Sequence, residues 1–160
     1  RGEVLVDVRS VGVCGSDVHY YEHGRIGDFV VEEPMVLGHE SAGVISAVGP
    51  GVTGLAVGQR VSVEPGVPDR SCPQCLAGRY NLCPQMRFFA TPPIDGAFAE
   101  QVVVPASWTA PLPSACDFVT AATLPVAGVT AVGILRLARV HAGDRVLITG
   151  AGAASRRRSR

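Results

Sequence analysis

The chain has 160 residues, of which 47% are hydrophobic and 18% charged, and its formal net charge is zero. These proportions are typical of a compact soluble protein and exclude a disordered chain. All 14 basic residues are arginines, and four of them lie among the last five positions. The body therefore has ten basic against fourteen acidic residues, and this acidic balance disfavours a nucleic-acid-binding surface.

Five cysteines, an odd number, occur in a chain that opens directly into a strand pattern with no signal peptide ahead of it. This favours metal binding in a reducing compartment over a disulfide framework, so we expect a cytoplasmic protein. The one long apolar stretch, around 118–135, is broken by Pro125 and Gly128. It predicts helices of a soluble protein and no membrane span.

The N-terminal half reads as short strands and turns. Residues 4–11 alternate between apolar and polar and predict a half-buried strand. Glycines flank Cys14 in the following loop, residues 16–21 predict a short helical turn, and residues 22–33 predict a polar loop. Residues 35–63 predict three strand-like runs separated by glycine-rich turns.

From residue 66 to a proline-rich boundary at 111–113 the chain still predicts loops and strands, and beyond that boundary its pattern becomes helical. Residues 66–84 have no periodicity, which fits a loop ordered by metal and not by a core of its own. Residues 96–104 predict another strand. Residues 117–140 are spaced helically, and Pro125 is expected to divide two helices. Residues 145–150 predict a short buried strand, so a β-rich domain precedes the first elements of an α/β domain.

Two groups of metal-ligating residue types stand out. Cys14, His39 and Glu40 are sparse and widely spaced, as in an open catalytic zinc site. The alternative for this group is a buried thiol and a half-exposed imidazole without a metal. The second group, Cys72, Cys75 and Cys83, is compact and thiolate-rich. A disulfide is its alternative, but two residues between thiols in a cytosolic chain favour a structural metal site.

These residues carry a resemblance to a known family. The phrases Gly12–Asp17, Gly38-His39-Glu40 and Gly58–Val61 resemble the zinc-dependent medium-chain alcohol dehydrogenases, and residues 14–20, 22–27, 64–66 and 88–93 resemble the sorbitol and xylitol (polyol) dehydrogenase branch. The resemblance implies a mainly β, GroES-like catalytic domain over residues 1–112, with a structural zinc lobe at 66–84. It also implies an incomplete α/β Rossmann domain over residues 113–160.

The resemblance further implies a function and its residues. A catalytic Zn²⁺ would be held by Cys14, His39 and Glu40, and a secondary alcohol, in this branch a polyol, would be oxidised to a ketone with hydride transfer to NAD. Ser16 matches the position that takes the alcohol proton, and His19 could pass that proton outward. Tyr20 matches a substrate-contacting position.

The family's structural zinc site uses four cysteines, and the first of them corresponds here to Asp69. Because a carboxylate can bind zinc, we expect an Asp69, Cys72, Cys75, Cys83 site, with a vacant site as the alternative. Cys116 matches no ligand position and is expected to be buried.

The chain departs from the family in two further places. Residues 121–128 contain Leu124-Pro125 where the polyol branch has Glu-Pro. This phrase resembles the zinc-free quinone reductases and leaves the substrate open. Gly150 and Gly152 match the start of a dinucleotide-binding motif, but Ser155 takes the place of the third glycine and arginines follow. We therefore expect truncation or a frameshift, zinc binding without tight NAD binding, and little or no turnover by these 160 residues.

Two other classes of function stay open. One is a non-catalytic zinc-binding module that pairs with full-length subunits, since homo-oligomers are expected for the complete enzyme. The other is a nucleic-acid binder built on a zinc knuckle and the basic tail, which the acidic body disfavours. We expect a small alcohol or polyol as the partner, and neither nucleic acid nor membrane.

Overall fold

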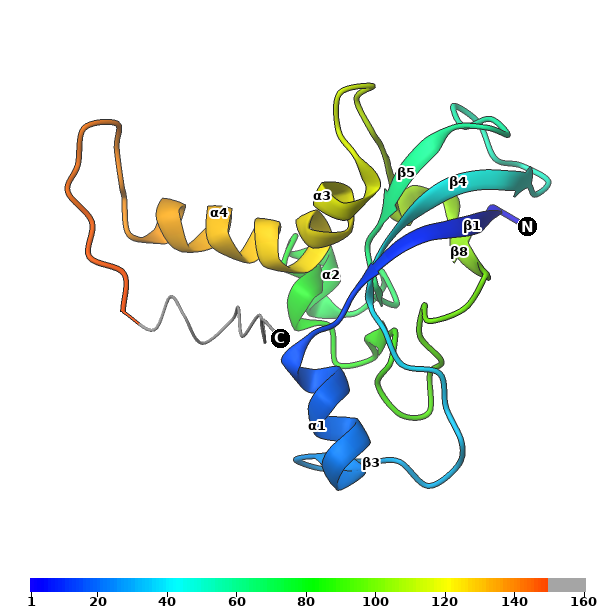
Figure 1. Ribbon diagram of the computed structural model, residues 1–160, viewed down its shortest axis with the longest axis horizontal. Helices are drawn as coiled ribbons and strands as arrows, with labels where there is room; N and C mark the ends of the chain where they lie inside the picture. The colour runs from blue at the N-terminus through cyan, green and yellow to red at the C-terminus, as the bar shows by residue number, and fades with distance from the viewer. Residues whose placement is uncertain (150–160) are drawn as a thin grey trace, which may run out of the picture.

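The structure, a computed structural model, describes residues 1–149 of the chain. Its centre is a five-stranded antiparallel sheet in the order β8-β1-β4-β5-β9. In Figure 1 the sheet curves strongly, α1 lies below it, and α3 and α4 lie to its left. The strands are β1 (Glu3–Gly12), β4 (Glu40–Val48), β5 (Arg60–Val63), β8 (Gln101–Pro105) and β9 (Thr109–Pro111).

The main core lies on one face of this sheet and follows from the alternation of β1. Val4 and Val6 are buried there, and their neighbours on the paired strands are buried with them. Each fully buried valine or isoleucine contributes about 1.5–3 kcal/mol relative to an exposed side chain, so this cluster is the main support of the fold. Its other buried members are Ile45, Val61, Val63, Ala97, Val102 and Val104.

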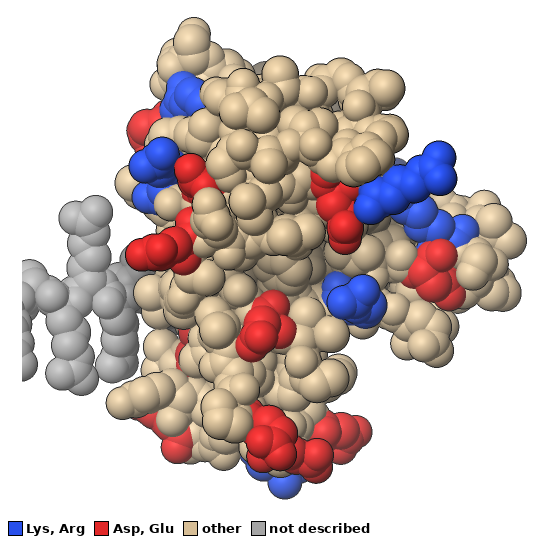
Figure 2. All heavy atoms as spheres, turned by 90° about the vertical axis from the view of Figure 1, so that its right-hand side faces the viewer, with Lys and Arg blue, Asp and Glu red and all other residues tan. Residues whose placement is uncertain are grey.

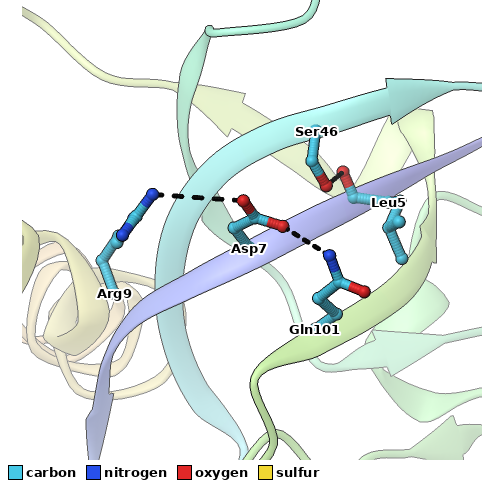
Figure 3. Close-up of polar contacts among 5 residues, drawn as sticks. All are labelled: Leu5, Asp7, Arg9, Ser46 and Gln101. Atoms are coloured by element: carbon cyan, nitrogen blue, oxygen red, sulfur yellow. Dashed lines mark hydrogen bonds and ion pairs between the residues drawn. The ribbon is translucent and has the colours of Figure 1, made fainter.

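Polar side chains join three strands on the outer face of the sheet, as Figure 3 shows. Asp7 on β1 accepts a hydrogen bond from Gln101 Nε2 on β8 at 2.8 Å, and Arg9 Nη2 lies 4.0 Å from the second carboxylate oxygen. Ser46 on β4 donates to the carbonyl of Leu5 at 3.4 Å. The hydrogen bond from Gln101 is the largest of the effects that lower the pKa of the Asp7 carboxyl. These contacts reinforce the strand register at the surface.

The strand at 4–11 is confirmed, but three other predictions need correction. Residues 35–63 form two strands, β4 and β5, and not three. The expected polar loop at 22–33 contains a small hairpin of β2 (Arg25–Ile26) and β3 (Phe29–Val30). The expected strand at 96–104 begins only at Gln101, because the backbone amides of residues 96–98 donate to the carbonyls of residues 36–38 instead.

Residues 66–84 contain more local structure than a bare loop. Strand β6 (Gly66–Val67) pairs with β7 (Arg87–Phe88), and two short helices follow in α2 (Pro73–Leu76) and η1 (Tyr80–Leu82). The ring of Tyr80 packs edge-on against Trp108 at 5.4 Å, on the 3₁₀ turn η2 (Ala106–Trp108). The lobe is thus anchored to the body by aromatic contact.

Helix α3 (Phe118–Thr123) continues through a π-helical turn, η3 (Leu124–Gly128), into α4 (Val129–Leu137). Pro125 therefore does not divide two helices as predicted. A proline near the start of a π turn needs no backbone N–H donor there, so the helix widens without breaking. Phe118–Leu137 is long and apolar enough to cross a membrane by length and composition alone, with 11% of its most apolar window buried.

The predicted strand at 145–150 is wrong for the part that the structure describes. Residues 145–148 have no regular structure, and Val146, Leu147 and Ile148 are exposed. A parallel-sheet strand forms only when neighbouring strands satisfy its backbone groups, and none pairs with it within residues 1–149. Gly150 lies outside the described residues.

Candidate functional site

The paired ends of β1 and β4 bring the first ligand group together. Gly12 on β1 pairs with Glu40 on β4, and the chain after Gly12 turns Cys14 towards the start of β4. One ligand atom from each of Cys14, His39 and Glu40 lies within 4.8 Å of the other two. His39 is buried, with 6% of its surface exposed. Thiolate, imidazole and carboxylate at this separation match the donor set of zinc.

Asp17 holds the two segments that carry these ligands. Its carboxylate is 3% exposed and accepts the backbone N–H of Cys14 at 2.8 Å and that of Gly38 at 2.9 Å. Its Oδ1 also lies 3.6 Å from Nδ1 of His39. A carboxylate beside one ring nitrogen orients the imidazole and leaves the other nitrogen, Nε2, available to a metal. Asp17 is therefore a positioning residue.

In the position that Glu40 adopts here, its carboxylate lies close to residue 12, where a side chain would displace it. A Cβ placed on Gly12 would lie 2.5 Å from Oε2 of Glu40, closer than real Cβ contacts allow. Gly15, on the other side of Cys14, has nothing within 4 Å of the corresponding position. The close approach at Gly12 fits a carboxylate aimed at a common centre with Cys14 and His39.

A cavity of about 250 Å³ opens beside His39. Ser16 and Tyr20 line it from α1 (Gly15–His23), and Phe88 and Thr91 line it from the opposite side. Burial raises the pKa of Tyr20, against a smaller opposite effect of a hydrogen bond with Thr91, so the phenol stays protonated at neutral pH. The remaining lining residues are Ile26, Phe29 and Ala90.

His19, predicted to pass the proton outward, and Leu124, which stands where the polyol branch has a glutamate, do not line this cavity. His19 is exposed on α1, where its ring contacts that of His23 at 4.5 Å, and it does not line the cavity. Successive helix positions point about 100° apart, so Ser16 and Tyr20 face inward while His19 does not. Leu124 lines a separate cleft with Trp108 and Tyr80.

The second ligand group is also assembled. One ligand atom each from Asp69, Cys72, Cys75 and Cys83 lies within 4.8 Å of the others. Oδ1 of Asp69 accepts the backbone N–H groups of Ser71 at 2.8 Å and Cys72 at 3.0 Å, which lowers its pKa to about 2. Burial, followed by the hydrogen bond with Cys72, raises the pKa of the Cys75 thiol to about 12. A cation favours the charged forms of such groups.

Cys116 is partly exposed, contrary to the expectation that it is buried. Its carbonyl accepts a hydrogen bond from the Arg60 guanidinium. Its side chain belongs to neither ligand group. Gly150 and Gly152 lie outside the described residues.

The sequence reasoning assigned no role to Asp17, Phe88 or Thr91. All three lie within phrases that carried the family resemblance, so the resemblance could have marked them as candidate site residues. The contacts that give them a role join segments distant in sequence, such as the bond of Asp17 to Gly38 across 21 residues. Only the fold reveals these contacts.

Comparison with known proteins gives concordant matches. The family described as Alcohol dehydrogenase GroES-like domain matches residues 1–114. A protein of Neosartorya fischeri called probable D-xylulose reductase A is 55% identical over 150 residues, which are 94% of this chain and 42% of that protein. The chain therefore spans about two-fifths of the length of this relative.

Solved structures show the same fold. A crystal structure of an NAD-dependent alcohol dehydrogenase superposes with a TM-score of 0.78 at 35% identity, over 89% of this chain and 41% of that chain. A cobalt- and zinc-bound thermostable alcohol dehydrogenase from Pyrobaculum aerophilum gives a TM-score of 0.74 at 31% identity, over 90% and 42%.

Proposed function

Because the chain belongs to the alcohol dehydrogenase family with a GroES-like domain, as its motifs predicted, we propose that it forms the metal- and substrate-binding part of a polyol dehydrogenase. The enzyme would oxidise a secondary alcohol to a ketone with NAD as the hydride acceptor. The observation that carries this proposal is the convergence of Cys14, His39 and Glu40 beside the Ser16–Tyr20 cavity. The prediction of a mainly β, GroES-like fold is confirmed.

The residues at the site fit a zinc ion. One thiolate, one imidazole and one carboxylate would hold it, and the two negative ligands balance its charge. When bound, zinc supplies a Lewis acid that polarises a hydroxyl group, and NAD supplies the hydride acceptor. Ser16 lines the cavity where that hydroxyl would sit and can accept its proton. Tyr20 and Phe88 shape the cavity and exclude water from it.

The outward proton path through His19 stays a prediction. Since His19 is exposed and does not line the cavity, a relay from Ser16 through His19 would require a bridging water. Thr91 lines the cavity beside Tyr20 and offers a second hydroxyl. We propose that the Ser16 hydroxyl accepts the substrate proton as it donates its own proton to a bridging water, from which the proton reaches the exposed imidazole of His19.

We also propose that Asp69, Cys72, Cys75 and Cys83 hold a second, structural zinc. Oδ1 of Asp69 is committed to two backbone N–H groups, so Oδ2 is the oxygen available to the metal. Three thiolates and one carboxylate complete a closed four-ligand site of the structural kind. Such a metal would order residues 66–84, whose own apolar contacts are few.

The test is metal content. The purified chain should bind two zinc ions, and Cys14→Ser with His39→Ala should remove one of them while Cys72→Ser with Cys75→Ser removes the other. Replacement of zinc by Co²⁺ should give visible absorption bands that separate the two sites. A chain that binds no stoichiometric metal while folded would overturn the proposal.

Turnover tests a separate expectation. The matched relative extends well beyond the part that this chain covers, and the glycines at 150 and 152 are only the start of a dinucleotide motif. A polypeptide of these 160 residues alone should therefore give little or no alcohol-dependent NADH. Robust NADH formation would refute this expectation and leave the metal sites intact.

A second candidate function is a non-catalytic zinc-binding module that associates with full-length subunits. The exposed apolar side chains of α4 favour it, because such a surface normally contacts another protein segment. Co-purification with a complete dehydrogenase would support this candidate. For the whole enzyme we propose a cytoplasmic homo-oligomer that acts on a small alcohol and has no nucleic-acid or membrane partner.

A further inference from the structure

Helix α1 carries a pair of histidines on its exposed face. His19 and His23 lie four residues apart, and the centroids of their rings are 4.5 Å apart. Residues at this spacing are neighbours on one face of a helix, one turn above the other. Both side chains are exposed, whereas Ser16 and Tyr20 of the same helix line the substrate cavity. The imidazole pair therefore lies outside that cavity, and it shares no residue with the two ligand groups found within residues 1–149.

The geometry of the pair suits a single metal ion. Two histidines four residues apart on one helix face are a recurrent arrangement for binding zinc. Because a ring nitrogen lies about 2.0–2.1 Å from its metal, two nitrogens of one metal are at most about 4.2 Å apart. Exposed rings whose centroids are 4.5 Å apart can bring one nitrogen each within this limit by turning about χ2. Oε2 of Glu22 already lies 3.9 Å from Nε2 of His23, so a carboxylate can join the two imidazoles.

The surroundings of the pair favour a cation. His23 is the last residue of α1, and the C-terminal end of a helix carries partial negative charge. Residues 22–33 contain four acidic side chains and one basic side chain, Arg25, whose guanidinium donates to the carbonyl of Gly27. In Figure 2 acidic side chains gather at the lower end of the visible face, which is the end of the molecule where α1 finishes in Figure 1. A negative potential of this kind raises the local concentration of cations.

We propose that His19 and His23, together with the carboxylate of Glu22, form a further metal site for a divalent transition metal such as Cu²⁺, Ni²⁺ or Zn²⁺. Imidazole nitrogens suit these three ions, and among them Cu²⁺ binds most tightly to a given set of ligands. Because the site lies in solvent, water completes the coordination and the metal exchanges freely. A bound metal links the last two turns of α1 and so stabilises the helix that presents Ser16 and Tyr20 to the cavity.

Ni²⁺ is the probe that tests this site, because unlike Cu²⁺ it does not oxidise the five cysteines of the chain. The zinc-loaded chain is titrated with Ni²⁺ by equilibrium dialysis, and elemental analysis counts the nickel bound and the zinc retained. We expect one Ni²⁺ per chain in addition to the retained zinc. Joining two ligands on one scaffold raises affinity by about 10²–10⁴-fold over a single ligand. His19→Gln and His23→Gln should therefore each weaken Ni²⁺ binding by about 100-fold.

His141→Gln is the matched control. His141 is exposed and its Nδ1 lies 3.7 Å from Oδ2 of Asp144, but no second histidine lies near it in the sequence. This variant should leave the affinity for Ni²⁺ unchanged. Absence of nickel beyond the zinc retained, or an equal loss in His19→Gln and His141→Gln, would overturn the histidine pair as a metal site. A chain that retains no zinc would instead overturn the proposed function, and the difference between the two variants would still report on the site on α1.

Discussion

Asp17 shows how one buried side chain can organise a site to which it contributes no ligand. Its two oxygens accept N–H groups from the segments that carry Cys14 and His39, and it lies beside the imidazole of His39. A buried carboxylate is stable only when its oxygens are hydrogen-bonded. The loops around Cys14 and Gly38 meet this need, and in return they are fixed relative to each other.

The substitution Asp17→Asn tests this role. An amide has one accepting oxygen, so either Cys14 or Gly38 loses the partner of its backbone N–H. Loss of such an outer partner typically weakens metal binding by about 10–100-fold, and we expect a loss of that size at the Cys14 site. Competition with a chelator measures it. Asp28→Asn, an exposed acid outside these bonds, is the control and should leave zinc affinity unchanged.

Glu64 has a half-buried carboxyl group, which lowers the stability of the fold when it is ionised. Burial raises the pKa of the Glu64 carboxyl above its ordinary range, against a smaller opposite effect of its hydrogen bond with Tyr80. A raised pKa means that the folded state binds the proton more tightly than the unfolded state. The free energy of unfolding therefore falls as the pH rises from the ordinary carboxyl pKa through the raised pKa of the folded state.

Glu64→Gln should remove this loss. We expect the variant to be more stable than the natural chain at pH 7 and to match it below about pH 3, where the carboxyl is protonated in both states. Urea unfolding at the two pH values measures the difference. If the variant is less stable at pH 7, burial does not dominate at Glu64.

At the scale of elements, the pairing of β1 with β4 decides the geometry of the metal site. Its register places Gly12 opposite Glu40, and His39 immediately precedes the strand. A shift by one residue would turn Glu40 to the other face of the sheet. Strand register therefore brings the three ligands together, which residue type alone cannot do.

Gly12→Ala should disturb this arrangement and Gly15→Ala should not. The new methyl at position 12 would collide with Oε2 of Glu40, whereas at position 15 it meets open space. We expect Gly12→Ala to weaken zinc binding at the Cys14 site by about ten-fold or more, because the methyl group displaces the Glu40 carboxylate. Zinc titration of both variants checks this, and equal affinities would count against a Glu40 ligand.

At the scale of the whole molecule, the sheet buries its apolar side chains and the C-terminal segments expose theirs. The sheet domain buries its valines, while α4 and the segment after it leave several large apolar side chains in solvent, among them Leu137 at 87% and Leu147 at 88% exposed. Large apolar side chains exposed in such number normally contact another protein segment.

We expect a polypeptide of these 160 residues to self-associate through this surface. Leu137→Glu should shift the chain towards the monomer, because a charge cannot be buried in an apolar contact without a partner. Val57→Glu, at an exposed turn between β4 and β5, is the control. Sedimentation velocity at micromolar concentration measures the change, and an equal effect of both substitutions would contradict the assignment.

The sequence by itself determined the ligand types, the strand at 4–11 and the β-rich class, because ligand chemistry and apolar periodicity are properties of residues near one another in the chain. It misplaced the strand at 145–150 and the break at Pro125, because a strand needs partners and a helix can widen around a proline. The tertiary structure alone decided that Asp17 joins two loops and that His19 faces solvent. Each of these depends on segments far apart in sequence that strand pairing brings together.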